Sequence, residues 1–212
     1  MKAHTKIIAA AAALLLAAAP SAARTIRDFF LSESGDVLNT LPATHRSDML
    51  AYYDAGRAVT YPNNLGGSDS LILVTDNLIS LSTSPVSDLQ MAMLTTKRDT
   101  FILVVNTVRL PAPDSRLRAF DTDWNEIDAD RIVKIPSMDD FVAIPKGSKT
   151  KKADITGQIR FPLIAYTVAP VTLALTARQS LKLFMSDDDW QAVEPYLADS
   201  ISCPYRIKLV RK

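Results

Sequence analysis

The densest group of acidic side chains runs from Asp121 to Asp130. Its spacing matches the first three ligand positions of a calcium-binding EF-hand loop at Asp121, Asp123 and Asn125. The match then fails, because Glu126 stands where glycine must turn the chain and Ile132 stands where a bidentate glutamate is needed. Two interpretations remain: a weak, irregular calcium site, or a solvated connection between strands in which Asp and Asn form the turn. The turn is favoured; the candidate ligands are Asp121, Asp123, Asn125 and Asp128.

Nucleophilic catalysis has few residues to draw on. A Ser-His-Asp hydrolase would have to use His45, and the sequence has no Gly-x-Ser-x-Gly elbow. The single cysteine, Cys203, excludes an intramolecular disulfide and a cysteine-based zinc site, and we expect it to be a small buried residue. Paired carboxylates from residues 121–130 are the remaining route to a hydrolase, without support from their spacing. The residues therefore favour a non-catalytic protein.

A basic loop offers a second kind of chemistry, the binding of an anionic partner such as a phosphate or a lipid headgroup. Its cations are Lys146, Lys149, Lys151 and Lys152. No aromatic side chain in this loop could stack on a nucleic-acid base. A solvated loop is the simpler interpretation, and it is favoured.

Composition limits the classes of protein to which the chain can belong. The 212 residues are 48% hydrophobic and 22% charged, with a net charge of +1. Such a balance is typical of a folded globular protein and excludes a disordered chain, a collagen-like repeat and a long coiled coil. The near-neutral charge provides no strong field for nucleic acid, and the six glycines form no phosphate-binding motif.

The N-terminal residues have the order of a secretory signal peptide. Lys2 and Lys6 precede an apolar run from Ile7 to Ala19, and the small residues Ser21 and Ala23 suit a cleavage site before Arg24. The run is shorter than the roughly 20 residues that span a bilayer. We therefore expect residues 1–23 to be removed and residues 24–212 to form one domain, soluble in the periplasm or outside the cell, with no transmembrane segment.

Hydrophobic periodicity predicts an α+β fold. Helices are expected within 24–56, at 138–142 and from 187, capped by Thr25, Ser137 and Ser186 respectively. Period-two runs joined by short loops make residues 57–134 an antiparallel β-meander, because parallel strands need long crossovers. Further strands are expected at 159–168, 171–176 and 205–209. The prediction is a curved antiparallel sheet of eight or nine strands, with helices near the N- and C-termini packed on one face.

Several segments resemble an uncharacterised family of small secreted proteins from Bacteroidetes. They are residues 25–30, 46–53, 78–94, 101–108, 113–124 and 188–197. The resemblance covers nearly all of the chain after residue 23, and it implies an exported domain of unknown function in a Gram-negative bacterium. It supplies no catalytic residue. Because no cysteine follows the leader, it implies a free protein rather than a lipoprotein.

Three functions are consistent with these features. The first is a non-catalytic envelope protein that binds another protein or an envelope ligand. The second is a hydrolase or a calcium-dependent protein that uses the acids of residues 121–130. The third is a carrier of apolar ligands, which requires a large apolar cavity on the concave face of the sheet. Apart from weakly bound calcium, no cofactor is expected.

Overall fold

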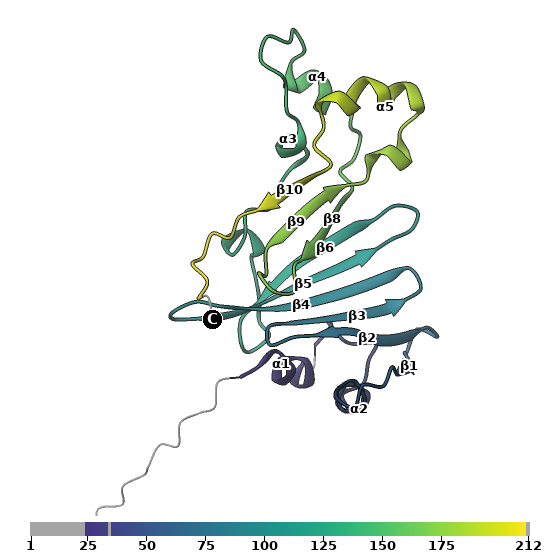
Figure 1. Cartoon of the computed structure of the whole chain (residues 1–212), viewed down its shortest axis with the longest axis vertical. Helices are drawn as coiled ribbons and strands as arrows, with labels where there is room; N and C mark the ends of the chain where they lie inside the picture. Colours follow the sequence, from purple (N-terminus) through teal and green to yellow (C-terminus); the bar gives the residue numbers. More distant parts are fainter. Residues whose placement is uncertain (1–23, 34, 211–212) are drawn as a thin grey trace, which may run out of the picture.

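Two antiparallel sheets make up the centre of the protein (Figure 1). The computed structural model describes residues 24–33 and 35–210. The predicted leader, residues 1–23, lies outside the described residues. No helix among the described residues is long and apolar enough to cross a membrane.

The larger sheet is a seven-stranded meander in which each strand pairs with the next along the chain. Its strands are β1 (Thr60–Pro62), β2 (Ser68–Val74), β3 (Leu78–Ser84), β4 (Ser87–Thr95), β5 (Thr100–Val108), β6 (Asp114–Phe120) and β7 (Glu126–Ile127). All of the pairings are antiparallel, as short connections require. The predicted α+β class, with a meander sheet and helices near both ends, is confirmed.

One face of this sheet is covered by α1 (Ile26–Ser32) and α2 (Ala43–Asp54). The Thr25 hydroxyl and the Asp28 carboxylate form a capping box that starts α1, as the sequence predicts. Phe29, Phe30 and Met49 of the helices are buried against alternate residues of the strands, among them Leu89, Met91 and Met93. Met91 and Met93 of β4 are therefore part of the hydrophobic core under the helices.

The other face is covered by a three-stranded sheet of β8 (Ile164–Val168), β9 (Leu175–Gln179) and β10 (Ser200–Cys203). The Gln90 side chain of β4 joins the two sheets, since its amide donates to the Val168 carbonyl at 3.2 Å and its oxygen accepts from the Val168 amide at 2.9 Å. Cys203 is buried in the core between the sheets, as expected, and burial raises the pKa of its thiol to about 11.

Most helices of the C-terminal half pack around a third hydrophobic core. The elements are η1 (Ala129–Arg131), α3 (Met138–Phe141), α4 (Lys152–Thr156), η2 (Leu181–Phe184), α5 (Asp187–Val193) and η3 (Glu194–Tyr196). Ile155, Leu181 and Trp190 are the centre of a third hydrophobic core, and Figure 1 places α4 and α5 beyond the end of the small sheet. Ala129 of η1 and Phe141 of α3 are instead buried in the core between the two sheets.

Two strand predictions in this half are wrong, the first in its position and the second because residues 205–209 form no strand. Residues 171–176 are mostly the turn between β8 and β9, in which the Ala169 amide donates to the Ala174 carbonyl and Leu173 has a φ of +55°. The alternation of Tyr205 to Leu209 is real, but it belongs to a segment that makes only single bridges to two neighbours. Its apolar side chains pack on the core between the sheets, which explains the period of two without a strand.

Candidate functional site

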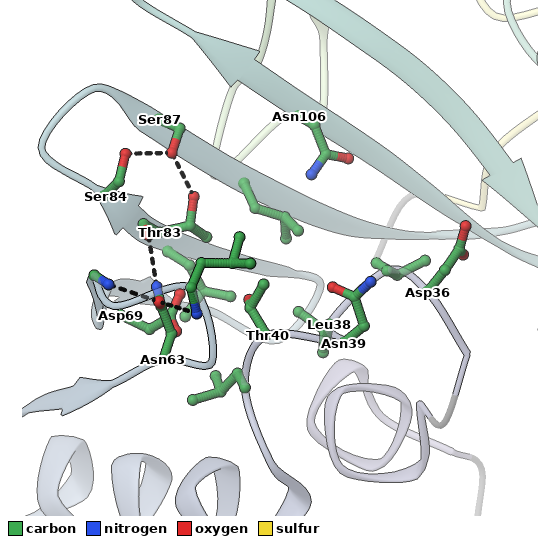
Figure 2. Close-up of a pocket in the computed structure, with 16 residues that line it drawn as sticks. Asp36, Leu38, Asn39, Thr40, Asn63, Asp69, Thr83, Ser84, Ser87 and Asn106 are labelled. Carbon is green, nitrogen blue, oxygen red and sulfur yellow. Dashed lines mark hydrogen bonds between the residues drawn. The ribbon is translucent and has the colours of Figure 1, made fainter.

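A pocket of about 350 Å³ lies at one end of the large sheet, on the face that carries the helices (Figure 2). Three parts of the chain enclose it: the connection between α1 and α2, the loop between β1 and β2, and the ends of β3, β4 and β5. The lining is mixed. It includes the leucines Leu38, Leu41, Leu65, Leu81 and Leu89 and the polar residues Asp36, Asn39, Thr40, Asn63, Asp69, Thr83, Ser84, Ser87 and Asn106.

The first wall is held in place by a buried carboxylate. Glu33 is only 2% exposed, and it accepts hydrogen bonds from the amides of Gly35 at 2.7 Å, Val37 at 3.3 Å and Leu38 at 3.1 Å. These bonds close the chain into a turn directly after α1. The turn presents residues 36–41 to the pocket as a fixed wall.

The second wall is the β1–β2 loop, which Asn63 closes. Its side-chain oxygen accepts from the amides of Leu65 at 3.1 Å and Gly67 at 2.9 Å, and its amide donates to the Thr83 carbonyl at 3.1 Å. Gly66 has a φ of +79°, a conformation that favours glycine. The Asn64 amide group donates to the Asn39 carbonyl, so this loop is tied to both the sheet and the first wall.

The third wall carries a row of hydroxyl groups at the β3–β4 hairpin. The Ser87 hydroxyl lies 2.9 Å from that of Thr83 and 2.6 Å from that of Ser84 (Figure 2). A hydroxyl group can donate one hydrogen bond and accept others. The row therefore offers a ligand both donors and acceptors along one side of the pocket.

Asp69 of β2 is the unusual member of the lining. The residue is 1% exposed, and neither carboxylate oxygen has a hydrogen-bond partner among the described residues. Burial raises the pKa of this carboxyl group; the neighbouring Asn63 amide lowers the pKa but makes no hydrogen bond to the carboxylate. A buried carboxylate without a partner destabilises the folded state, because the charge loses its hydration and no hydrogen bond replaces it.

The charges of the lining are all of one sign. Asp36 and Asp69 are its two acids, and none of the described residues that line it is Lys, Arg or His. Asp36 differs from Asp69 because it is exposed and forms an ion pair with Arg118 at 3.0 Å, which lowers the pKa of its carboxyl group. The pocket thus suits a neutral or positively charged ligand and disfavours an anion.

The acidic segment that stands out in the sequence lies elsewhere, between β6 and η1. Its first acid, Asp121, closes a turn: one oxygen accepts from the amides of Asp123 at 2.8 Å and Asn125 at 3.0 Å, and the other accepts from the Asn125 side chain at 2.9 Å. The Asn125 side-chain bond, followed by the backbone bonds, lowers the pKa of Asp121. The Asp121 carboxylate therefore closes a turn, which is the interpretation that the sequence favours.

The turn places Trp124 against the first helix. Trp124 has a φ of +64°, and its ring packs on Phe120 and Phe29 with centroid distances of 5.4 Å and 6.5 Å. A tryptophan rarely adopts this left-handed conformation, so the bonds of Asp121 compensate for local strain. The segment therefore helps to attach α1 to the sheet.

The other acids of the segment have separate positions. Asp123 is exposed, Asp128 caps η1 by accepting from the Asp130 amide at 3.0 Å, and Asp130 pairs with Arg206. None of them lines the pocket. Among residues 24–33 and 35–210, no group of three or more His, Cys, Asp and Glu side chains could hold a metal ion. The structure brings Asp121, Asp123 and Asn125 into one turn and leaves Asp128 in the next.

The remaining candidates also lie outside the lining of the pocket. Lys146, Lys149, Lys151 and Lys152 are exposed on the connection from α3 into α4. His45 of α2 stacks on Tyr61 with ring centroids 4.7 Å apart. Cys203 lies in the core on the opposite face of the large sheet from α2, so the sheet separates it from His45.

Comparison with known proteins places the chain in a family. Residues 18–206 match the family model described as "Protein of unknown function (DUF3256)". The chain belongs to this family. No curated protein matches it. A solved domain of an uncharacterised protein from Porphyromonas gingivalis W83 is similar, with 20% identity and a TM-score of 0.70 over 86% of this chain and 98% of that chain. At that identity the similarity shows a shared fold, and the organism agrees with the resemblance to Bacteroidetes proteins.

In this DUF3256 chain, sequence reasoning missed the pocket and its buried acid. One signal for Asp69 was present. Asp69 and Leu71 are two residues apart on β2, so they point to the same face, and Leu71 packs on the core under the helices. A carboxylate at an inward position of a strand is a better marker of a site than a cluster of acids in a turn.

Proposed function

We propose that this chain is an exported, non-catalytic binding protein of the cell envelope, and that the pocket holds a small ligand that is neutral or positively charged. The observation that carries the proposal is the lining: hydroxyls, amides and two carboxylates beside leucines, with no basic side chain among its described residues. Ligand sites generally combine apolar walls with a few fixed polar groups. At about 350 Å³, the pocket is near the lower end of their usual size.

The rigidity of the walls supports binding as the role. Glu33 holds the first wall, Asn63 holds the second, and Asn64 joins them by a bond of 3.2 Å to the Asn39 carbonyl. A pocket whose walls are already hydrogen-bonded loses little entropy when a ligand enters. No histidine of residues 24–33 and 35–210 lines the pocket, since His45 stacks on Tyr61 outside it, so the hydroxyl row favours recognition over nucleophilic attack.

Export is the second part of the proposal, and it rests on the basic, apolar and small-residue order of residues 1–23. We expect the protein recovered from its native cells to begin at Arg24 and to fractionate with the periplasm or the medium. N-terminal mass spectrometry of the purified protein makes the measurement. Recovery of the chain in the cytoplasm with Met1 and the following residues intact would overturn this part.

The binding proposal is tested with a fragment screen by protein NMR. The fragments form three sets of similar size that are neutral, cationic or anionic at pH 7.5. Neutral and cationic fragments are expected to shift the amide signals of Leu65 and Asn106, and anionic fragments to bind at least tenfold more weakly. Ser87→Phe fills the pocket and should abolish these shifts. Thr167→Phe, on the exposed side of β8, is the matched control and should leave them unchanged.

Two results would contradict a small-molecule site. One is a screen in which no fragment shifts a pocket signal. The other is a set of shifts that Ser87→Phe does not remove, which would place the fragments elsewhere. In that case, a protein partner captured by crosslinking in the native envelope would become the better account of the same exported chain.

A further inference from the structure

Asp69 sets the most specific requirement on a ligand. Glu33 is buried to a similar degree, but three backbone amides donate hydrogen bonds to it. Asp69 is 1% exposed and has no donor among the described residues, although it lies beside Asn63 (Figure 2). The fold thus satisfies one buried carboxylate fully and leaves the other open.

The missing partner is not supplied by the rest of the lining. A metal ion would need several ligands, and no group of three His, Cys, Asp or Glu side chains that could hold one occurs among the described residues. The nearest amide side chain is that of Asn63: one of its N–H groups donates to the Thr83 carbonyl and its oxygen accepts from Leu65 and Gly67, while its second N–H lies beside Asp69 without forming a hydrogen bond to it. A proton or a positively charged group from a ligand can complete the site.

We infer that Asp69 is the anchor of the pocket and that the ligand brings a primary ammonium group to it, on a short apolar chain. The inference rests on the proposed function and narrows its ligand class. Leu38, Leu81 and Leu89 contact the apolar part, and the Ser84–Ser87 hydroxyl pair faces it from the third wall. An ammonium group donates three hydrogen bonds, which suits a carboxylate and neighbouring hydroxyls.

The β1–β2 loop has to adjust when the ammonium group binds. Both oxygens of Asp69 are covered in this structure, so the ammonium reaches them only after a small shift of the Asn63 side chain or of the loop. Leu65 at the tip is 83% exposed, so it can move without breaking core contacts. The amide signals of Leu65 and Gly66 are therefore expected to change more with an amine than with an alcohol of the same size.

The test uses pentylamine, pentan-1-ol and pentanoate, which share a chain and differ in the polar group. They are titrated into the exported protein at pH 7.5 and followed by NMR. We expect pentylamine to bind at least tenfold more tightly than pentan-1-ol, and pentanoate not to shift the pocket signals. Asp69→Asn should reduce the affinity for pentylamine to that for pentan-1-ol. Asp188→Asn removes an exposed carboxylate of α5 that lies outside the lining, and it should leave the preference unchanged.

The two proposals fail in different ways. Equal binding of pentylamine and pentan-1-ol by the wild-type protein overturns the anchor and leaves the pocket as a binding site. A preference for the amine that Asp69→Asn retains also overturns the anchor. If the neutral and anionic probes as well as the amine fail to shift any pocket signal, both the anchor and the proposed pocket function are overturned. The comparison of pentylamine with pentan-1-ol uses only the wild-type protein, so it tests the preference for an ammonium group even if Asp69→Asn does not fold.

Discussion

The carboxylates of the turn at residues 121–125 and of the pocket around Asp69 differ in both burial and hydrogen bonding. In the turn, Asp121 lies near the surface, yet three donors occupy its two oxygens. In the pocket, Asp69 is buried and has no donor among the described residues. In this protein the cluster of acids in the sequence forms a turn. The candidate site instead contains a single buried carboxylate without a hydrogen-bond donor among the described residues.

Burial by itself does not make this difference. Glu33 is 2% exposed and Asp69 is 1% exposed, so the two are equally buried. Three amide donors and the nearby Arg46 give Glu33 a structural role. Arg46 in turn donates to the Phe30 carbonyl at 2.6 Å. Substitutions at Glu33, Asp121 and Asp69 test this contrast between carboxylates with and without hydrogen-bond donors.

The largest effect is expected at Glu33. Glu33→Ala leaves three backbone amides, two of them in buried bonds, without an acceptor and removes a counter-charge from Arg46. The free energy of unfolding should fall by roughly 3 kcal/mol. For a domain of this size, the melting temperature would fall by about 6–12 °C. Calorimetry makes the measurement, with Glu194→Ala, at an exposed glutamate, as the control. A loss below about 1 kcal/mol would show that Glu33 does not hold the first wall.

A smaller effect is expected at the turn. Asp121→Ala removes the acceptor for two backbone amides and one side chain, so the free energy of unfolding should fall by about 1–2 kcal/mol. The indole NMR signal of Trp124 should also move, because Asp121 holds that residue in its left-handed conformation. Asp123→Ala, in the same turn but exposed, should leave both unchanged. An unmoved Trp124 signal in Asp121→Ala would contradict the role of this acid.

Much of the fold could be predicted because its signals are local. Thr25 and Ser186 cap their helices as their spacing indicates, and the period-two runs from β2 to β6 form the meander. The C-terminal half was harder, because a period of two shows that side chains alternate between core and solvent without showing that a neighbouring strand is present. Tyr205 and Leu209 alternate in this way and each makes a single bridge.

The pocket could not be predicted because it is assembled from distant segments. Leu38, Asn63 and Asn106 come from three connections or strands that meet only in the folded chain. The bulge in β2 adds a second difficulty. Leu71 packs under the helices, while Leu73 packs on the opposite face, although strict alternation would place them together. The sequence does not reveal this bulge, so alternation predicts one face for Leu71 and Leu73 that the two residues do not share.

The two acids should respond to pH with opposite signs. Asp69 has a folded-state pKa raised above its ordinary value of 3.8 by burial, so it favours the folded state most in acid, and this contribution is lost as pH rises from 3.8 through the folded pKa. Asp121 has a lowered pKa, first because of the Asn125 side chain, so its contribution is present above 3.8 and is lost as pH falls through the folded pKa.

Two neutral variants separate these contributions. As pH rises, Asp69→Asn should become more stable relative to the wild type, while Asp121→Asn should become less stable relative to it. Urea unfolding between pH 3 and pH 8, expressed as differences from the wild type, gives both curves. If the stability of both variants relative to the wild type changed in the same direction as pH rises, folding would not shift the pKa values of Asp69 and Asp121 in opposite directions.

The smallest expected effect is that of calcium on the turn. A cation with six to eight oxygen ligands would have to displace the amides that Asp121 now accepts, and Asp128 is already bonded to the Asp130 amide. A site with a dissociation constant on the order of 1 mM, in roughly 5 mM calcium, would stabilise the folded state by about 1 kcal/mol and raise the melting temperature by about 2–4 °C. We expect a change below about 1 °C between calcium and a chelator. A larger rise, lost in Asp123→Asn, would mean that the turn exchanges its internal hydrogen bonds for a metal ion. The acids of the turn and of the pocket would then both be ligand sites, distinguished by the cation that each prefers.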